Sequence, residues 1–170
     1  MAGFELAQVD GFAAASGPGS FTGVRIGLAC IKGLAEATGK PAVAVSNLEA
    51  LATFGTAARR AVVLDARRGE VYTAVYDAEG RVIQPERVLK LPEWLASLPD
   101  GPLEFVSAGM DLDLMGTRFA GAHVVRSSHM LAGAVARIAF SKWQRGEASS
   151  PEALDANYVR RSDAELFWKE

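Results

Sequence analysis

Two different spacings of apolar residues alternate over the first sixty positions of the chain. Short runs of apolar and small residues at 11–15 and 42–45 have the length and composition of buried strands. Between them, over 21–38, apolar residues recur every three or four positions, which predicts an amphipathic helix. A second helix is expected over 46–54, because a serine there is followed three residues later by a glutamate, the spacing of a capping box. The first part of the chain is therefore expected to alternate strand and helix.

Both ends of the helix expected over 21–38 carry termination signals. Ser20 or Thr22 provides a hydroxyl that can accept a hydrogen bond from an N–H group of the first turn. Gly39 and Pro41 follow in the order typical of a helix C-terminus, with glycine just past the end and proline beyond it.

Beyond residue 60 the pattern changes to a series of strands separated by turns. Strands are expected over 61–66, 71–77, 81–89, 103–109 and 122–127, and helices over 92–98 and 129–144. Pro85 predicts that its strand lies at an edge of the sheet, because proline cannot donate to a central ladder. The polar and aromatic tail from residue 148 is expected to lie over the surface as an arm.

Strands that alternate with helices and then form a meander predict an α/β fold with a mixed sheet. We place a boundary near Arg59–Arg60, which divides residues 1–59 from residues 60–170. A strand–loop–helix unit needs neighbouring strands in its sheet, and the residues before 11–15 do not provide them. Either the later strands complete that sheet, or part of the original chain is missing.

The helix over 21–38 has two apolar faces. One face is formed by Val24, Leu28, Ile31 and Ala35. The other is made mostly of small residues, namely Ile26, Ala29, Cys30, Gly33 and Ala37. A helix that is apolar on two sides is expected to be buried on two sides, and small residues let a second helix approach closely. The second neighbour is either another part of this chain or a partner subunit, and the pattern leaves both open.

The loop before this helix is rich in glycine. The loop and the first turn comprise Gly17, Pro18, Gly19, Ser20, Phe21, Thr22 and Gly23, with Arg25 just beyond. A helix N-terminus attracts anions, so one interpretation is a phosphate site. The spacing matches neither a P-loop, since the nearest downstream lysine is Lys32, nor G-x-G-x-x-G, since Thr22 stands where the third glycine belongs. The other interpretation is a tight turn that sets the helix against the sheet.

The remaining candidates for chemistry are weak. His123 and His129 stand six residues apart without any metal-binding motif, so we expect structural roles for both. No G-x-S-x-G segment is present, and Cys30 falls in the middle of a helix, where a buried thiol is the ordinary case. We therefore predict no catalytic residue, no metal ligand and no cofactor.

A charged turn lies between the two strands expected over 61–66 and 71–77. It contains Asp65, Arg67, Arg68 and Glu70. Such a cluster could bind an anion or a partner, or it could be a solvated hairpin whose surface ion pairs contribute little energy.

Composition and charge restrict the function classes further. The chain has 170 residues, 49% of them hydrophobic, with a net charge of −2 and a pI near 5.8. A self-sufficient nucleic-acid-binding protein usually has a basic surface, although a partner subunit could supply one.

The single cysteine allows no internal disulfide, which fits a reducing compartment. No apolar run reaches the roughly 18 residues of a membrane span, and the N-terminus lacks the basic start of a signal peptide, so we expect a cytoplasmic protein without membrane contact.

Three segments, in order along the chain, resemble the landmarks of one protein family. They are GPGSFTGVRIGLACIKGLA (17–35), LDARRGEVYTAVYD (64–77) and YVRRSDAE (158–165). Together they resemble the bacterial TsaB (YeaZ) family, and the likeness covers nearly the whole chain. Three ordered matches are more specific than the glycine loop alone.

The resemblance implies the two-lobed ASKHA fold of actin, Hsp70-like and RNase H-like proteins. It implies a non-catalytic scaffold subunit of the complex that forms threonylcarbamoyladenosine at position 37 of tRNA. The implied partners are the catalytic paralogue TsaD, which carries the metal and the nucleotide, and the ATPase TsaE. A homodimer is implied when the chain is alone, and contact with tRNA is implied to be indirect. The helix over 21–38 would then pair with TsaD or with a second copy.

The resemblance also raises one alternative and one departure. The family is similar in sequence to the peptidase M22 glycoproteases, so the alternative function is a nucleotide-binding or glycoprotease-like hydrolase that uses the Gly17–Gly23 loop. Family members usually begin with an aspartate-bearing strand, a hairpin and a helix, and this chain starts after that segment. We therefore expect an N-terminally truncated first lobe, whose exposed strand edges favour self-association.

Overall fold

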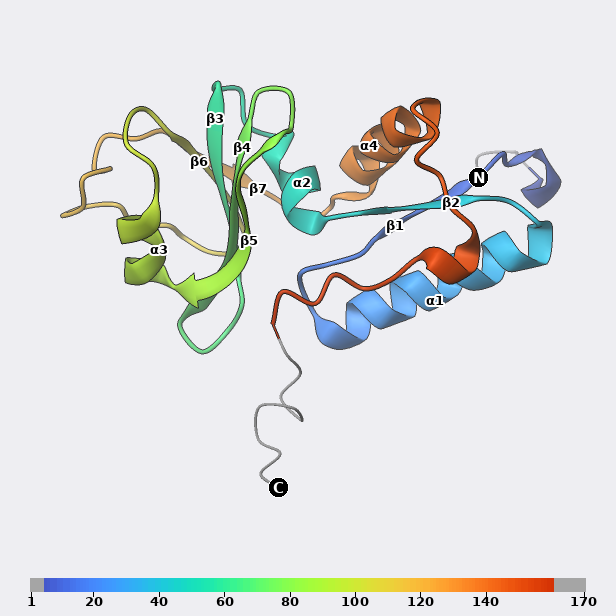
Figure 1. The fold of residues 1–170 in the computed structure, drawn as a ribbon. Coiled ribbons are helices and arrows are strands. Elements are labelled where there is room, and N and C mark those ends of the chain that lie inside the picture. The colour runs from blue at the N-terminus through green and yellow to red at the C-terminus, as the bar shows by residue number, and fades with distance from the viewer. Residues whose placement is uncertain (1–4, 161–170) are drawn as a thin grey trace. The chain divides into compact units, whose positions relative to one another are not determined.

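The computed structural model describes residues 5–160, which form two compact units (Figure 1). Of the described residues, the first unit contains 5–47 and 132–157, and the second contains 48–131 and 158–160. The expected boundary at Arg59–Arg60 differs from this division, because both arginines lie in a strand of the second unit's sheet. The first unit also includes a helix from the far end of the chain.

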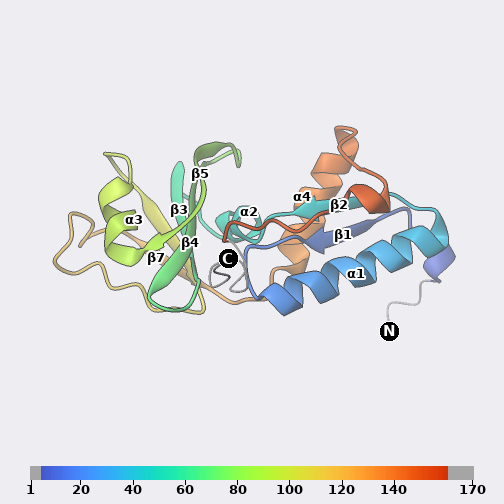
Figure 2. The same ribbon diagram turned by 60° about the horizontal axis from the view of Figure 1, so that its bottom comes forward.

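The first unit is built on a parallel pair of strands, β1 (Phe12–Ala15) and β2 (Ala42–Val45). The connection between them is α1 (Phe21–Thr38), which lies along one side of the pair. The other side is covered by α4 (Ala132–Gln144), as Figures 1 and 2 show. A short 3-10 helix, η1 (Leu6–Gln8), precedes β1. The core of this unit contains Ala14, Leu28, Ala35, Ala42 and Leu154.

The predicted bounds of α1 are confirmed at both ends. The side chain of Ser20 is the N-cap and accepts a hydrogen bond from the backbone N–H of Gly23. Gly39 ends the helix in the left-handed conformation, with φ of 63°, and its N–H donates to the carbonyls of the last turn. A residue with a side chain would be strained at this φ, which explains why glycine ends the helix.

The segment after α4 is part of the first unit, and its described residues are exposed or half-buried, as expected of a surface arm, with the exception of the buried Leu154. Ser149 and Ala42 exchange two backbone hydrogen bonds of 2.9 and 3.1 Å, so the segment pairs with the edge of β2. A 3-10 helix, η2 (Pro151–Ala153), then brings Leu154 into the core, where only 1% of it is exposed. An open strand edge and one apolar side chain together hold the segment in place.

The second unit is a mixed five-stranded sheet in the order β5-β4-β3-β6-β7. Its strands are β3 (Arg59–Asp65), β4 (Glu70–Asp77), β5 (Val82–Lys90), β6 (Glu104–Ala108) and β7 (Val124–Ser127). β3, β4 and β5 form the antiparallel meander that the sequence predicts, and β6 and β7 continue the sheet in parallel with β3. β5 carries Pro85 and lies at one edge, which confirms the prediction of an edge strand.

The core of the second unit lies between the sheet and α3 (Leu91–Ser97). Trp94 of α3 meets Phe105 edge to face, and Phe105 meets Phe119 in the same way, with ring centroids 5.7 and 5.2 Å apart. The remaining short helix, α2 (Asn47–Ala52), begins at the junction between the two units.

The position predicted for His129 is wrong, because α4 begins at Ala132 rather than at residue 129. His129 lies in the preceding segment, and its carbonyl accepts a hydrogen bond of 3.0 Å from the N–H of Leu131. This tight turn interrupts the helical pattern. The chain also passes from the second unit to the first between Leu131 and Ala132.

Candidate functional site at the glycine loop and helix α1

The glycine loop is tied to its own unit by hydrogen bonds to the backbone. The N–H of Ser16 donates to the carbonyl of Val45 at 2.8 Å, which extends the β1–β2 ladder into the loop. Asn47 holds the next two carbonyls, since its backbone N–H donates to Gly17 at 2.8 Å and its side-chain amide to Pro18 at 3.0 Å. Gly17 has a φ of 101°, which a residue with a side chain rarely adopts, and the Gly17–Pro18 peptide is cis. The loop is therefore a built structural turn.

The groups that a phosphate site would use have other partners. The hydroxyl of Ser20 accepts the N–H of Gly23 at 3.3 Å and so caps α1. The guanidinium of Arg25 lies 3.7 Å from the centre of the Phe21 ring. Lys32 donates to a carbonyl at residue 152, with an N–O distance of 3.4 Å. Of the two interpretations of this loop, the geometry favours the tight turn.

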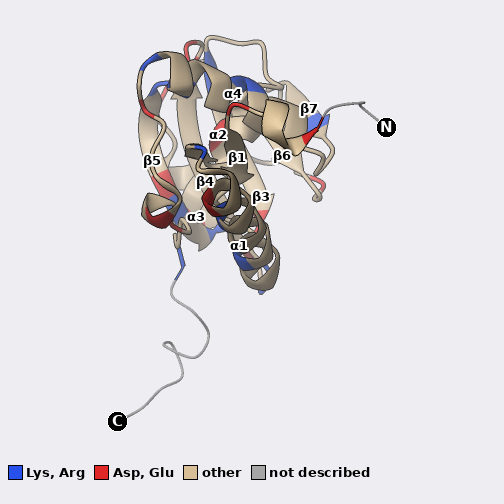
Figure 3. Cartoon of the chain, turned by 90° about the vertical axis from the view of Figure 1, so that its right-hand side faces the viewer, with Lys and Arg blue, Asp and Glu red and all other residues tan. Residues whose placement is uncertain are grey.

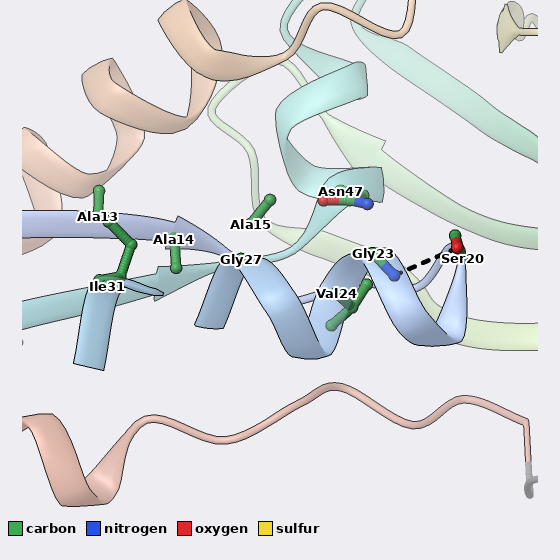
Figure 4. Close-up of a pocket in the computed structure, with 9 residues that line it drawn as sticks. All are labelled: Ala13, Ala14, Ala15, Ser20, Gly23, Val24, Gly27, Ile31 and Asn47. Carbon is green, nitrogen blue, oxygen red and sulfur yellow. Dashed lines mark hydrogen bonds between the residues drawn. The ribbon is translucent and has the colours of Figure 1, made fainter. Parts of the chain in front are cut away.

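A pocket of about 360 Å³ lies between β1 and the N-terminal half of α1 (Figure 4). It is lined by Ala13, Ala14, Ala15, Ser20, Gly23, Val24, Gly27, Ile31 and Asn47. Its walls are mostly small and apolar. The two polar side chains are those of Ser20, which caps α1, and Asn47, whose Oδ1 atom is buried and has no hydrogen-bond partner among the described residues. Asn47 was not singled out from the sequence, although an Asn within two residues of the end of a buried strand is a signal that could have been used.

The second apolar face of α1 is exposed. Ile26 is 60% exposed, and Ala29, Cys30, Gly33 and Ala37 are exposed with it. A Cβ built at Gly33 would meet no atom within 4 Å. Most of α1 is tan in Figure 3, because only three of its 18 residues are charged. We call Ile26, Ala29, Cys30, Gly33 and Ala37 the small-residue face. No neighbour from residues 5–160 covers it, so the interpretation of a neighbour within this chain finds no support in the part that the structure describes.

The charged turn joins β3 to β4 and meets a residue from the end of the described chain. Arg67 and Arg68 both have positive φ, 66° and 56°, a conformation typical of tight turns between antiparallel strands. The N–H of Arg67 donates to the Asp65 carboxylate at 2.7 Å. Arg160 forms an ion pair with Glu70 and donates to the carbonyl of residue 66. Two of the landmark segments thus lie together, although the part of the third beyond residue 160 is outside the described residues.

The histidines lie apart from any cluster of potential metal ligands. Among residues 5–160 no three His, Cys, Asp or Glu side chains are grouped so that they could hold a metal ion. His123 contacts one carboxylate, that of Glu104, at 3.0 Å.

None of the described helices is both long and apolar enough to cross a membrane.

Glu104 is a buried carboxylate that the sequence pattern did not single out. It is 4% exposed, and its Oε2 atom accepts the backbone N–H groups of Thr56 at 2.6 Å and Ala57 at 3.1 Å. Burial raises its pKa, but the hydrogen bonds from Ala57, His123 and Thr56 outweigh burial and hold the pKa below its ordinary value. A Cβ at Gly55 would lie 2.5 Å from Oε2, so only glycine fits there. Glu104 fixes the segment after α2 to the sheet.

Fold and sequence comparisons place this chain among proteins of known architecture. A family profile described as TsaD, tRNA N6-adenosine threonylcarbamoyltransferase, matches residues 1–142. The mixed sheets and this match define the chain as an α/β protein of the ASKHA class.

Individual relatives define the family within that class. The tRNA threonylcarbamoyladenosine biosynthesis protein TsaB of Bacillus subtilis is 34% identical over 92% of this chain and 72% of its own length. The structure of YeaZ from Pseudomonas aeruginosa superposes with a TM-score of 0.77 and 33% identity, covering 92% of this chain and 76% of that one. A second Pseudomonas aeruginosa structure, of an uncharacterized protein with similarity to peptidase YeaZ, has a TM-score of 0.76 and 35% identity, over 94% and 77%. The chain therefore belongs to the TsaB (YeaZ) family, as its three sequence landmarks indicate.

Proposed function

We propose that this chain is a non-catalytic scaffold subunit in the formation of threonylcarbamoyladenosine at position 37 of tRNA. Its small-residue face binds the catalytic paralogue TsaD. The ATPase TsaE joins the larger complex, and contact with tRNA is indirect. When TsaD is absent, the same face pairs two copies of the chain.

The exposure of the small-residue face is the observation that carries this proposal. The opposite side of α1 buries Leu28 and Ala35 in the core, while Ile26 on the small-residue face is 60% exposed. A contiguous apolar surface of this kind marks an interaction site, and small side chains let a partner helix approach closely. The family is named for threonylcarbamoyladenosine biosynthesis, so we look for the partner among the proteins of that pathway.

Ala29→Arg is expected to weaken binding to the TsaD of the same organism by about a hundredfold or more, because burying an unpaired charge costs about 3 kcal/mol or more. Ala29 is exposed and lies at the centre of the small-residue face, so the chain itself should stay folded. The measurement is co-purification followed by calorimetric titration. Ala136→Arg is the matched control, since Ala136 is an exposed alanine on α4.

Two outcomes would contradict the scaffold proposal. Equal binding of TsaD by the two arginine variants would exclude the small-residue face as the interface. Threonylcarbamoyl transfer to tRNA by this chain without TsaD would exclude a non-catalytic role.

The alternative, a hydrolase that uses the Gly17–Gly23 loop, makes a different prediction. It requires tight binding of ATP or ADP by the chain alone, measured by calorimetry with and without a divalent metal. Gly19→Val should then abolish binding, because a side chain at Gly19 comes within 3.2 Å of the Asn47 amide. Nucleotide binding with these properties would favour the enzyme over the scaffold.

A further inference from the structure

The two histidines of the chain differ in what holds their rings. The Nδ1 atom of His123 lies 3.0 Å from the carboxylate Oε1 of Glu104. The backbone of His123 is fixed as well, because its carbonyl accepts the N–H of Phe105 at 2.9 Å just before β7. The ring of His129 instead packs on Gly109, where a Cβ would come within 2.0 Å of the ring Nε2. Of the two rings, that of His123 alone is oriented by a carboxylate of the described residues.

The contact with Glu104 decides which nitrogen of the His123 ring carries a hydrogen. Burial raises the pKa of this carboxyl group, but hydrogen bonds from Ala57, His123 and Thr56 outweigh burial and hold the pKa below its ordinary value. The carboxylate is therefore ionised at neutral pH, and an ionised carboxylate can only accept a hydrogen bond. Nδ1 is thus the N–H nitrogen, and in the neutral ring the lone pair is on Nε2.

The nitrogen that carries the lone pair faces solvent. The side chain of His123 is 74% exposed, whereas that of Glu104 is 4% exposed. Because Nδ1 lies against the buried carboxylate, Nε2 belongs to the opposite, exposed edge of the ring. No described residue forms a hydrogen bond with Nε2. A contact with so exposed a ring contributes little to stability, so its main consequence is the fixed orientation of an accessible nitrogen.

Three kinds of chemistry use a histidine that a carboxylate orients. A metal ligand needs further ligands, and among residues 5–160 no three His, Cys, Asp or Glu side chains are grouped to hold an ion. A general base that activates a side chain needs a hydroxyl or thiol beside it, and no described side chain offers one to Nε2. A covalent nucleophile needs an accessible lone pair and a group that stabilises the positive ring formed by attack. His123 and Glu104 meet this third requirement.

We propose that His123 is a phosphorylation site, whose Nε2 atom takes a phosphoryl group from a small phosphoramidate or acyl phosphate. Nε2 bonds to phosphorus as the bond between phosphorus and the leaving nitrogen or oxygen breaks, and the leaving group departs with that electron pair. Nδ1 keeps its hydrogen, and the Glu104 carboxylate neutralises the positive charge that the ring gains. Nothing is oxidised or reduced. This inference does not depend on the function proposed for the small-residue face.

The test uses the whole folded chain and phosphoramidate as the probe. His123 is expected to be phosphorylated about tenfold or more faster than His129, measured by mass spectrometry of peptides kept at neutral pH. The product should be the Nε2 isomer alone, identified by NMR, because Nδ1 is bound to Glu104. The same chain in urea should give both isomers, since unfolding frees Nδ1.

Glu104→Gln should slow the phosphorylation of His123 about tenfold or more, because an amide oxygen can hold the Nδ1 hydrogen but does not neutralise the positive ring. Glu93→Gln is the matched control, since Glu93 is an exposed carboxylate on α3, and it should leave the rate unchanged. Circular dichroism compares the folding of the two variants. If Glu104→Gln does not fold, the isomer formed in the folded wild-type chain decides instead.

Three results would overturn the inference. The first is an equal rate of phosphorylation at His123 and His129 in the folded chain. The second is a mixture of the Nδ1 and Nε2 isomers at His123 in the folded chain. The third is a folded Glu104→Gln variant that is phosphorylated at His123 as fast as the wild type.

Discussion

Replacing Glu104 by leucine is expected to lower the free energy of unfolding of the second unit by about 3–5 kcal/mol at neutral pH. The carboxylate is the acceptor for two backbone N–H groups, those of Thr56 and Ala57, in a site where it is only 4% exposed. Leucine leaves both donors without a partner, and each buried unsatisfied donor costs about 1–3 kcal/mol. Urea denaturation of the whole chain, followed by a probe in the second unit, measures the loss.

Glutamine at the same position separates the charge from the geometry. Its single oxygen can still accept both backbone N–H groups, so we expect a smaller loss, about 1–2 kcal/mol, from the missing negative charge. His123→Ala should cost less than either change, because the His123 side chain is 74% exposed and its contact with Glu104 is largely in solvent. The loss of stability is therefore expected to be largest for Glu104→Leu, smaller for Glu104→Gln and smallest for His123→Ala, in line with the burial of each group.

The same carboxylate makes the second unit sensitive to acid. The folded pKa of Glu104 lies below its ordinary value of 4.5, so folding favours the ionised form. Its contribution is therefore complete above that ordinary value and is lost as the pH falls through the lower folded pKa. The difference in stability between the wild-type chain and Glu104→Gln should shrink as the pH is lowered from 7 into this range.

Glu93→Gln is the matched control, since Glu93 is an exposed carboxylate in the first turn of α3. It should change the stability by a few tenths of a kcal/mol and leave the pH profile almost unchanged. A Glu104→Gln chain as stable as the wild type, with the same dependence on pH, would show that the buried carboxylate does not hold the segment after α2.

The elements with strong local signals could be predicted from the sequence. The helix over 21–38 has helical spacing, a capping serine and a terminal glycine, and the structure reproduces both of its ends. The meander and its edge strand follow from alternating runs, turns and Pro85. In each case the deciding interactions lie within a few residues along the chain.

Contacts between distant residues could not be predicted in the same way. Glu104 stands at the start of an apolar run, which is typical of an exposed strand end, and only the approach of residues 55–57 buries it. Arg160 and Glu70 lie in two separate landmark segments, and nothing local to either indicates that they form an ion pair. The sequence indicated a second apolar face on α1, but whether that face is covered depends on residues elsewhere in the chain.

Leu154 shows most clearly how a distant contact changes the interpretation of a segment. The residues around it are polar and rich in serine and proline, a composition typical of a surface arm. Leu154 nevertheless has only 1% of its surface exposed and lies in the core with Leu28 and Ala35 of α1. This core contains few large side chains, because the strands beneath α1 contribute mostly alanine.

Leu154→Ala is therefore expected to destabilise the first unit by about 2–5 kcal/mol, the usual cost of a leucine-sized cavity in a core. In a unit with so small a core, this loss should also be visible as faster amide hydrogen exchange along α1 and β2, with the second unit unaffected. Leu6→Ala is the matched control, since Leu6 is 47% exposed and its truncation removes little buried surface. If both alanine variants leave the hydrogen exchange of α1 unchanged, the segment after α4 does not stabilise this helix. The helix that carries the small-residue face would then be held in place by its packing on the strands alone.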